Sequence, residues 1–510
     1  MKKIEYIIVQ AGGKGTRLQH LTENKPKALV SVNNSPLLFH LFNKFPDSRF
    51  VIITDYKHDV IKQYLQTYAK VNYVIVHSKG TGNVCGLKEA GNFIPHNKAC
   101  LLLWCDLLLS PEFNVPAFDN DTDCFIGITD KFQCSWSYNN GNMQKRQSSD
   151  DGIVGCNLLK DGSILRDCPT EGSFLKWVID KKLKHKSFNV NLIGEIGSLE
   201  SFNKINSVDN RCRPYNQMIF SEDEVIKKGL TPDAVKLIDR EVTWYKEMSS
   251  AGFSGIPKIK SFNPLTMQRI HGTNIFQAKL NEQEKKSVLL NLVATVKEMH
   301  KLKHTDADGF DILKEYYFKT MDRLHSIREL IPFSNDNVIR INGKICNNVL
   351  VNSDFLYQIV TSHLMDTVFA PIHGDCTLTN TMVDDNKNIY FIDARGYFGS
   401  KTVIGDVRYD WAKLYYSIAG NFDQFNIGNF SLHVKENEVT YSIGDGGWSQ
   451  FEDILLSSLP ENCDLREIKL IHSIIWLSLA SHCSDNYDAL CTAFYNGSYL
   501  LQSVYEEYNV

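Results

Sequence analysis

The chain has 510 residues, more than one hydrophobic core usually accommodates, so we expect two or three domains. Its hydrophobic content of 43% and charged content of 22% are ordinary for a globular protein, and the formal net charge of −4 argues against a broad nucleic-acid-binding surface. No apolar stretch approaches membrane-spanning length, and the 13 cysteines form neither a CxxC pair nor a zinc-type cluster. The composition therefore predicts a cytoplasmic protein with reduced thiols that binds neither nucleic acid nor membrane.

The N-terminal part alternates between short apolar runs, which predict buried strands, and amphipathic segments, which predict helices. The predicted strands are Tyr6–Val9, Phe50–Asp55, Tyr73–Val76 and Leu101–Trp104, and the predicted helices are 36–45, 58–69 and 86–93. This alternation predicts an α/β fold with a parallel sheet covered on both faces. Ligands of such sheets bind at the carboxyl ends of the strands, where a glycine loop and Asp106 lie.

Beyond this sheet the pattern changes twice. From Cys124 to Lys186 it is irregular and polar, which we interpret as an inserted region that shapes an acceptor pocket. A short β-rich segment is predicted around 217–230, and long amphipathic helices such as 281–303 follow. The predicted organisation is a first domain at residues 1–205, a linker at 206–215 and a second domain at 216–510.

The glycine-rich turn after the first predicted strand carries the first chemical signature. It reads Ala11-Gly12-Gly13-Lys14-Gly15-Thr16-Arg17-Leu18, and Lys25-Pro26-Lys27 follows. Glycines after a strand let backbone N–H groups approach phosphates closely. The GxxxxGK[ST] spacing of a P-loop is absent, and a dinucleotide-binding loop needs a third glycine where Leu18 stands. The turn therefore indicates a phosphate-binding loop of another type.

This pattern resembles the sugar-phosphate and phosphocholine nucleotidyltransferases across the first predicted domain. The resemblance implies a Rossmann-like nucleotidyltransferase domain in which four residues cradle a nucleoside triphosphate: Gly12, Gly13, Gly15 and Thr16. It further implies that Arg17 stabilises the transferring phosphate and that Lys27 neutralises developing charge, as this chemistry requires. Mg²⁺ ligands are implied at Asp106 and at Glu195, which replaces the family's usual aspartate. The alternative for either acid is a cap or turn role.

The identity of the nucleotide rests on weaker features. The segment Lys79-Gly80-Thr81-Gly82 occupies the place of the family's base-contacting loop, so Gly80 and Gly82 are expected to approach the nucleotide. A plain turn would have the same sequence. CTP is favoured because the short form of this domain resembles the phosphocholine cytidylyltransferases, while UTP, dTTP and GTP stay open.

The second chemical signature lies far downstream, as His373-Gly374-Asp375, then Asn380 and Asp393. With its His-Gly-Asp variant, this spacing resembles the aminoglycoside phosphotransferases and choline kinases. The resemblance implies a protein-kinase-like α+β domain in which Asp375 accepts the hydroxyl proton and Asn380 and Asp393 bind Mg²⁺. Three upstream residues are implied to bind ATP: Lys227, its partner Glu241 and, in the hinge, Met267. Arg395, beside Asp393, either binds an acceptor or forms an ion pair.

Together the signatures predict a bifunctional enzyme that uses Mg²⁺, ATP and CTP. It would phosphorylate a small alcohol and couple the phosphate to CTP, giving a CDP-linked product for surface polysaccharide synthesis. A transferase or reductase would use this product in the next step of the pathway. A polyol acceptor, such as the ketose fructose, needs polar side chains, and Arg395, Asp406 and Arg408 suit its hydroxyls. We favour a sugar or polyol because no cluster of acids stands beside the aromatic residues of this half. Choline instead needs an aromatic cage. The aromatic candidates for that cage, which could equally be core residues, are Trp411, Tyr415, Tyr416, Trp448 and Trp476.

Three alternatives to this reading stay open. One is a choline kinase joined to a phosphocholine cytidylyltransferase. Another is an anomeric sugar kinase joined to a UTP- or GTP-dependent pyrophosphorylase. The third is that one of the two modules is a degenerate regulatory domain without activity.

Overall fold

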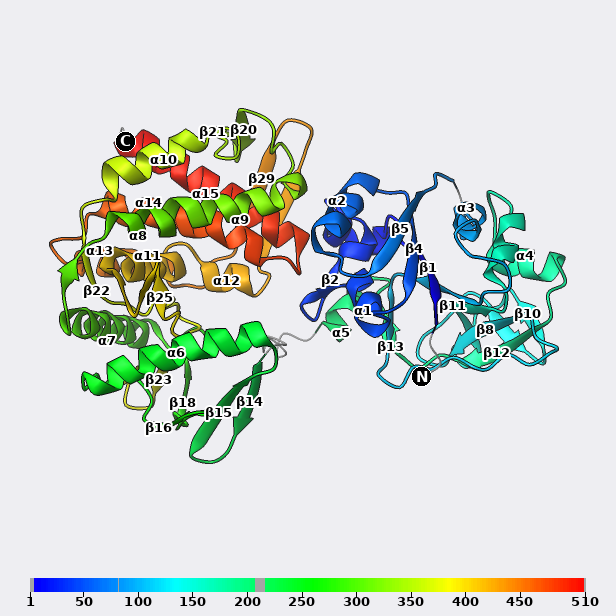
Figure 1. Ribbon diagram of the computed structural model, residues 1–510, viewed down its shortest axis with the longest axis horizontal. Coiled ribbons are helices and arrows are strands. Elements are labelled where there is room, and N and C mark those ends of the chain that lie inside the picture. Colours follow the sequence, from blue (N-terminus) through cyan, green and yellow to red (C-terminus); the bar gives the residue numbers. More distant parts are fainter. Residues whose placement is uncertain (1–3, 81, 207–215, 509–510) are drawn as a thin grey trace. The chain divides into compact units, whose positions relative to one another are not determined.

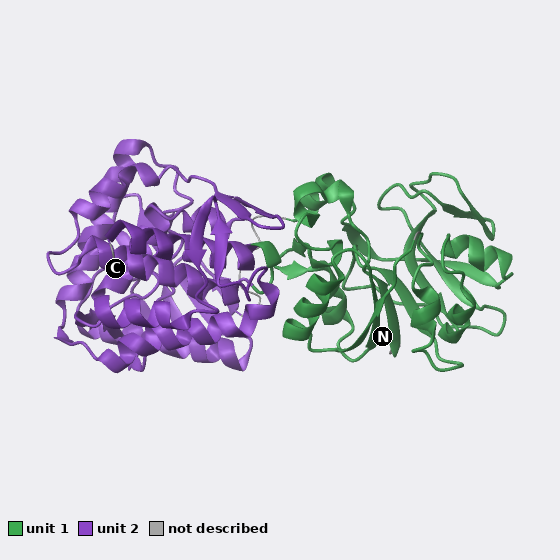
Figure 2. Cartoon of the chain, turned by 90° about the horizontal axis from the view of Figure 1, so that it is seen from above, with its two compact units in different colours: residues 1–211, 484–488 green, residues 212–483, 489–510 purple. Residues whose placement is uncertain are grey.

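The computed structural model describes residues 4–80, 82–206 and 216–508. Contacts divide the chain into two compact units: unit 1 is residues 1–211 with 484–488, and unit 2 is residues 212–483 with 489–510 (Figure 1, Figure 2). Apart from Asn206, the predicted linker at 206–215 lies outside the described residues and stays a prediction. Among the described helices, none is both long and apolar enough to cross a membrane.

Unit 1 is built on a nine-stranded mixed sheet. Its main path runs in the order β10-β9-β11-β6-β1-β4-β5, and β8 pairs with β11 and β12. The strands are β1 (Tyr6–Gln10), β4 (Arg49–Thr54), β5 (Asn72–His77), β6 (Cys100–Trp104), β8 (Cys124–Thr129), β9 (Ser137–Asn139), β10 (Asn142–Gln144), β11 (Gly152–Leu159) and β12 (His185–Asn189). β5, β4, β1 and β6 are parallel neighbours as predicted, whereas β11 runs antiparallel to β6. The α/β class and the parallel pairing of the four predicted strands are therefore confirmed, and antiparallel strands that were not predicted extend the sheet.

The segment 124–186, which looks irregular in sequence, extends this sheet. It contributes β8 to β11, the first residues of β12 and helix α4 (Phe174–Asp180). β11 is buried along its whole length, but its glycines and Asn157 interrupt the apolar run that would announce a buried strand. Gly155 is required there because a Cβ at this position would overlap the indole ring of Trp104. The interpretation of the segment as an irregular insert is therefore wrong.

Helices α1 (Leu37–Lys44), α2 (His58–Tyr68) and α3 (Leu87–Gly91) connect the parallel strands and confirm the three predicted helices. α1 turns Leu37, Leu38, Leu41 and Phe42 toward the core, because a spacing of three and four residues places them on one helix face. The glycine loop leads from β1 into two short 3-10 helices, η1 (Thr16–Thr22) and η2 (Lys27–Leu29). These helices set Thr16 and Lys27 at the carboxyl end of the sheet.

Unit 2 begins with a four-stranded antiparallel sheet in the order β14-β15-β17-β16. Its strands are β14 (Asn216–Phe220), β15 (Glu224–Gly229), β16 (Ile259–Phe262) and β17 (Leu265–Gln268). The first two form a hairpin, which confirms the predicted β-rich segment (Figure 1). Helix α6 (Pro232–Ser250) packs on β15 and begins at Thr231, whose side chain accepts a hydrogen bond from the Ala234 N–H group. Pro232 in the first turn suits this start, since its missing N–H would be unpaired there anyway.

The rest of unit 2 is mostly helical. Its longer helices are α7 (Glu282–Lys301), α9 (Lys319–Ile327), α10 (Ser353–His363), α11 (Val407–Ile418), α14 (Leu465–Leu479) and α15 (Tyr487–Tyr508). α11 packs on α14 and is buried almost throughout. The segment 372–380 connects strand β22 (Val368–Pro371) to strand β23 (Thr381–Asp384), and β23 pairs with β24 (Ile389–Phe391) just before Asp393. A sheet with one helix followed by a helical part agrees with the kinase-like architecture, which stays a prediction.

Candidate functional sites

The glycine loop after β1 has the backbone conformation and the open space of a phosphate-binding loop. Gly15 has a φ of 68°, in the left-handed region that side chains disfavour. Gly12 lies against the next loop, where a Cβ would be 3.0 Å from the backbone nitrogen of Asp55. Gly13 has no described atom within 4 Å of its Cβ position. The space beside Gly13 is therefore open to a ligand, which could meet the N–H groups of the loop there.

Lys27 and Asp106 form an ion pair at the carboxyl end of β6, with only 11% and 8% of their side chains exposed. Burial alone would lower the pKa of Lys27, because it disfavours the charged form. Attraction, chiefly to the Asp106 carboxylate, outweighs burial, so the pKa of Lys27 is raised. Burial and the Asp106 carboxylate together raise the pKa of Glu195. The fold thus brings together three predicted site residues that are far apart in sequence.

Asp106 and Glu195 fit the predicted Mg²⁺ site. Asp106 Oδ1 is buried and has no hydrogen-bond partner among the described residues. Burial is the main cause of the raised pKa of Glu195, and repulsion by Asp106, which a bound cation would relieve, adds to it. No group of three or more His, Cys, Asp or Glu side chains that could hold a metal occurs in the described part of the chain. An ion here would therefore complete its shell with phosphate oxygens and water, as Mg²⁺ commonly does.

Arg17 lies at the edge of the same cluster. It is exposed at the start of η1, next to the exposed Thr16. A Cβ on Gly197 would lie 2.7 Å from Glu195 Oε1 and 3.2 Å from Arg17 Nη2, so both side chains converge on this glycine. Arg17 is therefore placed to contact a phosphate bound between the glycine loop and the two carboxylates.

The two glycines of the predicted base-contacting loop make close protein contacts. Gly82 has a φ of 90°, and a Cβ on it would overlap the carbonyl oxygen of Gly172. A Cβ on Gly80 would be 2.8 Å from Cys85 Sγ. Packing within unit 1 thus accounts for both glycines, and their contact with a nucleotide stays a prediction.

In unit 2, Lys227 joins two carboxylates. Its Nζ is 2.7 Å from Glu241 Oε2 and also pairs with Asp393. Because side chains alternate along a strand, β15 turns Lys227 inward and Lys228 toward solvent. Burial opposes the charge of Lys227, but Asp393 and Glu241 raise its pKa, while burial raises the pKa of Glu241 to about 7. Met267 is buried on β17, beside this strand.

The loop before Asp375 is held in place by buried polar groups. Both carboxylate oxygens of Asp410 accept hydrogen bonds from the backbone N–H groups of residues 373 and 374, at 2.9 and 2.7 Å. The Asp375 N–H donates to His373 Nδ1, so Nε2 of this imidazole carries the proton and donates to the carbonyl of Ile392. Burial lowers the pKa of His373, in keeping with a neutral ring. Asp410 and His373 are therefore structural, and they fix the backbone from which Asp375 projects.

Asp375 has partners on both of its carboxylate oxygens. Asn380 Nδ2 donates to Oδ2 at 2.8 Å, and Lys413 Nζ lies 2.9 Å from Oδ1. Lys413 is on α11 and only 12% of its side chain is exposed, against 33% for Asp375. Sequence reasoning missed Lys413. A signal for it exists, because it stands three residues after Asp410, and residues at that spacing share one helix face.

Asn380 and Asp393 fit the second predicted Mg²⁺ site. An amide oxygen and a carboxylate are both ligands that Mg²⁺ accepts. Asp393 is 52% exposed at its side chain, and its φ of 57° is unusual for a residue other than glycine. Such backbone strain concentrates at functional sites. Asp393 pairs with Lys227, and Asn380 contacts Asp375. The N–H group of Ile392, the residue before Asp393, donates to the Asn380 carbonyl at 3.1 Å, so the two pairs lie close together.

Arg395 forms the ion pair that was one of its two predicted roles. Its Nη2 lies 2.6 Å from Glu315 Oε1, and Glu315 also pairs with Lys319. Its guanidinium carbon is 4.0 Å from the ring centre of Tyr397 and 5.2 Å from that of Tyr409. Burial of Glu315 would raise its pKa, but the neighbouring Arg395 and Lys319 lower this pKa to about 2. The carboxylate is therefore fully ionised at neutral pH.

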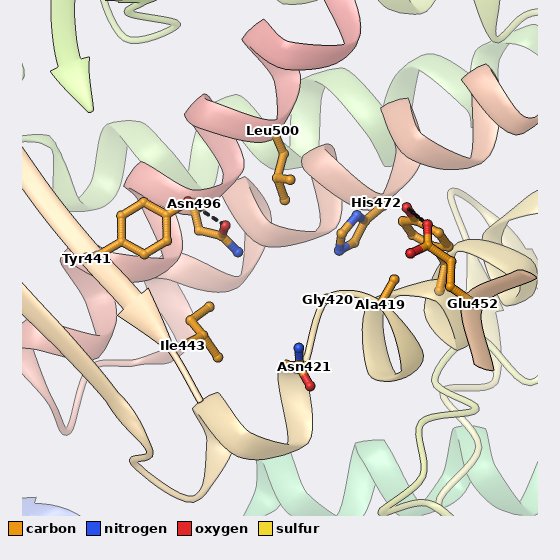
Figure 3. Close-up of a pocket in the computed structure, with 10 residues that line it drawn as sticks. Ala419, Gly420, Asn421, Tyr441, Ile443, Glu452, His472, Asn496 and Leu500 are labelled. Carbon is orange, nitrogen blue, oxygen red and sulfur yellow. Dashed lines mark hydrogen bonds between the residues drawn. The ribbon is translucent and has the colours of Figure 1, made fainter. Parts of the chain in front are cut away.

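A cavity of about 270 Å³ lies beside another face of α11 (Figure 3). Tyr415 donates to Glu452 and Tyr441 donates to Asn496 at its wall, each at 2.7 Å. The described residues that line it include none of the segment 373–380 and not Asp393. The cavity is therefore a feature separate from the predicted kinase site.

Comparison with known proteins identifies the N-terminal domain. Residues 7–116 match the model of the MobA-like NTP transferase domain, which covers β1 to β7 (Leu107–Leu109) and therefore the glycine loop, Lys27 and Asp106. Unit 1 accordingly contains an NTP transferase domain of this type.

Individual relatives match only short parts of the chain. The UTP–glucose-1-phosphate uridylyltransferase AglF of Haloferax volcanii is 40% identical over 76 residues, 14% of this chain and 31% of that protein. The glucose-1-phosphate cytidylyltransferase of Salmonella typhimurium is 38% identical over 64 residues, 12% of this chain and 25% of that protein. The chain thus spans a third or less of the length of these relatives. The structure of the inositol-1-phosphate CTP transferase from T. maritima aligns with 40% of this chain and 96% of that one, at 20% identity and a TM-score of 0.34.

Proposed function

We propose that the chain is a bifunctional enzyme that phosphorylates a small alcohol with ATP and then transfers a cytidylyl group from CTP to the new phosphate. The observation that carries the proposal is a pair of separate clusters, one in each unit, in which a buried lysine lies beside two carboxylates. The lysine and its carboxylates are Lys27, Asp106 and Glu195 in unit 1 and Lys227, Glu241 and Asp393 in unit 2. Such lysines neutralise phosphates, and such carboxylates hold the accompanying cation.

The proposed reaction of unit 1 is nucleotidyl transfer. A phosphate oxygen of the acceptor attacks the α-phosphorus of CTP, the bond to the bridging oxygen of the β-phosphate breaks, and pyrophosphate leaves. The N–H groups of the glycine loop hold the triphosphate, while Lys27 and Arg17 neutralise the charge that develops on it. Mg²⁺, when bound by Asp106 and Glu195, would polarise the phosphate oxygens. The MobA-like domain that contains these residues supports this half of the proposal.

The proposed reaction of unit 2 is phosphoryl transfer from ATP. Asp375 accepts the proton of the alcohol, whose oxygen attacks the γ-phosphorus, and ADP leaves with the bridging oxygen. Lys227, oriented by Glu241, would bind the ATP phosphates. Mg²⁺, when bound by Asn380 and Asp393, would neutralise the transferring group. The placement of Asp375 between Asn380 and Lys413 supports its role, because both groups orient the carboxylate.

The order of the two reactions follows from their chemistry, since the phosphomonoester made in unit 2 is the type of acceptor that unit 1 requires. The product would be a CDP-linked alcohol, which we place in surface polysaccharide synthesis ahead of a transferase or reductase. CTP is the proposed nucleotide because relatives named for CTP or cytidylyl transfer occur among the matches, although one named for UTP does too.

The test measures the two half-reactions separately on the full chain. ADP release is followed with ATP and a panel of alcohols, and pyrophosphate release with CTP and the phosphorylated alcohols. Lys227→Met should abolish only the first and Lys27→Met only the second. Lys228→Met, the exposed neighbour on β15, is the matched control and should change neither. Loss of both activities in either single variant would contradict two independent sites.

A further inference from the structure

The surroundings of Asp375 bear on which alcohols unit 2 accepts. A quaternary ammonium such as choline is bound by aromatic faces that remain available to a cation, with anionic groups nearby. The five aromatic residues that could form such a cage are all in the core: Trp411, Tyr416 and Trp476 at 0% exposure, Trp448 at 4% and Tyr415 at 8%. Apart from Tyr415, which lines the cavity described above, they are therefore closed to a ligand of that size.

Two of these rings already carry a cation of the protein. Lys413 Nζ lies 4.7 Å from the ring centre of Tyr416 while it also pairs with Asp375. Lys285 Nζ lies 5.1 Å from the ring of Trp448. A bound ammonium would have to displace Lys413 from the ring of Tyr416.

Arg395 adds a second positive group on the same side. A Cβ on Gly374, the residue before Asp375, would lie 2.9 Å from Arg395 Cβ, so this side chain packs against the catalytic loop. Its guanidinium partner, Glu315, also binds Lys319. Lys413 and Arg395 thus place two cations beside the loop, and each already covers an aromatic face: Lys413 that of Tyr416 and Arg395 that of Tyr397.

Asp393 and Asp410 are also close to the loop, but Asp393 pairs with Lys227, and Asp410 accepts hydrogen bonds from the backbone N–H groups of residues 373 and 374. Asp423 is a further acid, next to Thr379 and Ser417. Burial raises its pKa to about 6, so it stays mostly ionised at neutral pH, but at 3% exposure it is closed to a ligand. The tyrosines and Glu452 of the cavity in Figure 3 could suit an ammonium, but that cavity is not lined by the loop that carries Asp375. A cation bound there would not present its hydroxyl to the catalytic carboxylate.

We propose that the alcohol phosphorylated by unit 2 is a neutral polyhydroxy compound, a sugar or polyol, and that cationic alcohols are rejected. Lys413 and Arg395 repel an ammonium group while their N–H donors suit hydroxyl oxygens. This inference rests on the proposed kinase activity and deepens it by deciding between a polyol and choline as the acceptor class.

The test is a competition between alcohol classes on the full chain with ATP and Mg²⁺. ADP release is measured with fructose, glycerol and other polyols, and with choline and ethanolamine. We expect kcat/KM for the best neutral acceptor to exceed that of either cationic alcohol by about 100-fold or more, and choline not to inhibit the neutral reaction. Turnover of choline equal to or better than every neutral alcohol would overturn the inference while leaving kinase activity intact. Turnover of neither class would refute the kinase assignment, and the inference would fall with it.

A variant pair tests the cause of the preference. Lys413→Gln should lower the ratio of kcat/KM for the neutral alcohol to kcat/KM for the cationic alcohol by at least tenfold, whatever its effect on the absolute rate. Lys285→Gln removes a lysine that also lies over an aromatic ring but donates to the carbonyls of Gly446 and Gly447, and it should leave the ratio unchanged. An unchanged ratio in Lys413→Gln would contradict the proposed role of this cation. If that variant does not fold, the wild-type competition alone decides.

Discussion

Replacing Lys413 with methionine tests how the catalytic carboxylate of unit 2 is held. Methionine keeps an unbranched stem against Tyr416 but removes the ammonium that lies 2.9 Å from Asp375 Oδ1. A hydrogen bond to a charged group contributes about 1.5–3 kcal/mol. Asp375 retains its bond from Asn380, so the variant should lose part of its carboxylate orientation and not all of it. If the lost interaction energy raises the barrier for proton transfer to Asp375, kcat drops about 10- to 100-fold.

The assay separates this role from a general structural one. We expect the KM for ATP to stay within about twofold while kcat falls, since an interaction that matters only in the transition state lowers kcat and kcat/KM together. Lys413→Arg, which keeps the positive charge, should recover most of the rate. The thermal midpoint of each variant controls for folding, and Lys285→Met serves as the matched lysine control. A folded Lys413→Met enzyme with wild-type kcat, or one in which only KM rises, would refute the reasoning.

Three further predictions address the remaining elements. Asp375→Asn should abolish ADP release with the free alcohol, because the hydroxyl loses its proton acceptor, but should spare pyrophosphate release when the phosphorylated alcohol is supplied. Asp106→Ala removes the partner of Lys27 and should do the reverse; undiminished pyrophosphate release would place the metal elsewhere. Gly155→Ala should destabilise the protein by about 1–3 kcal/mol in urea unfolding, because the added methyl group overlaps the Trp104 ring, and unchanged stability would show that the ring can move freely.

Local patterns allowed much of unit 1 to be predicted. The strands β1, β4, β5 and β6 are short apolar runs, and the glycine loop follows the first of them, so both could be read from neighbouring residues. The antiparallel strand β11 could not, because its identity depends on the partner β6 and on a glycine that accommodates Trp104. Pairing between distant segments leaves little trace in the order of residue types.

The same distinction applies to the candidate sites. The spacing from His373 to Asn380 is a local motif, and the Lys227–Glu241 pair follows from a strand and the helix after it. Lys413 reaches Asp375 from a helix that packs on the loop only in the folded chain, so its spacing from Asp410 indicates a shared helix face but not its partner. The pairing of Arg395 with Glu315 is likewise a tertiary property. For this reason the sequence predicts the reaction classes but leaves the acceptor open.

The most direct test of the account follows phosphorus through both reactions in one sample. The full chain is incubated with fructose or another neutral polyol, Mg²⁺ and ATP, and ³¹P NMR monitors the products before and after CTP is added. We predict that ATP alone yields ADP and a phosphomonoester, and that CTP then converts the phosphomonoester into a diphosphate-linked product with release of pyrophosphate. CTP without ATP should yield nothing from the free alcohol. Formation of the diphosphate-linked product without ATP, or a phosphomonoester that persists in the presence of CTP and of every other nucleoside triphosphate, would contradict two consecutive sites on one chain.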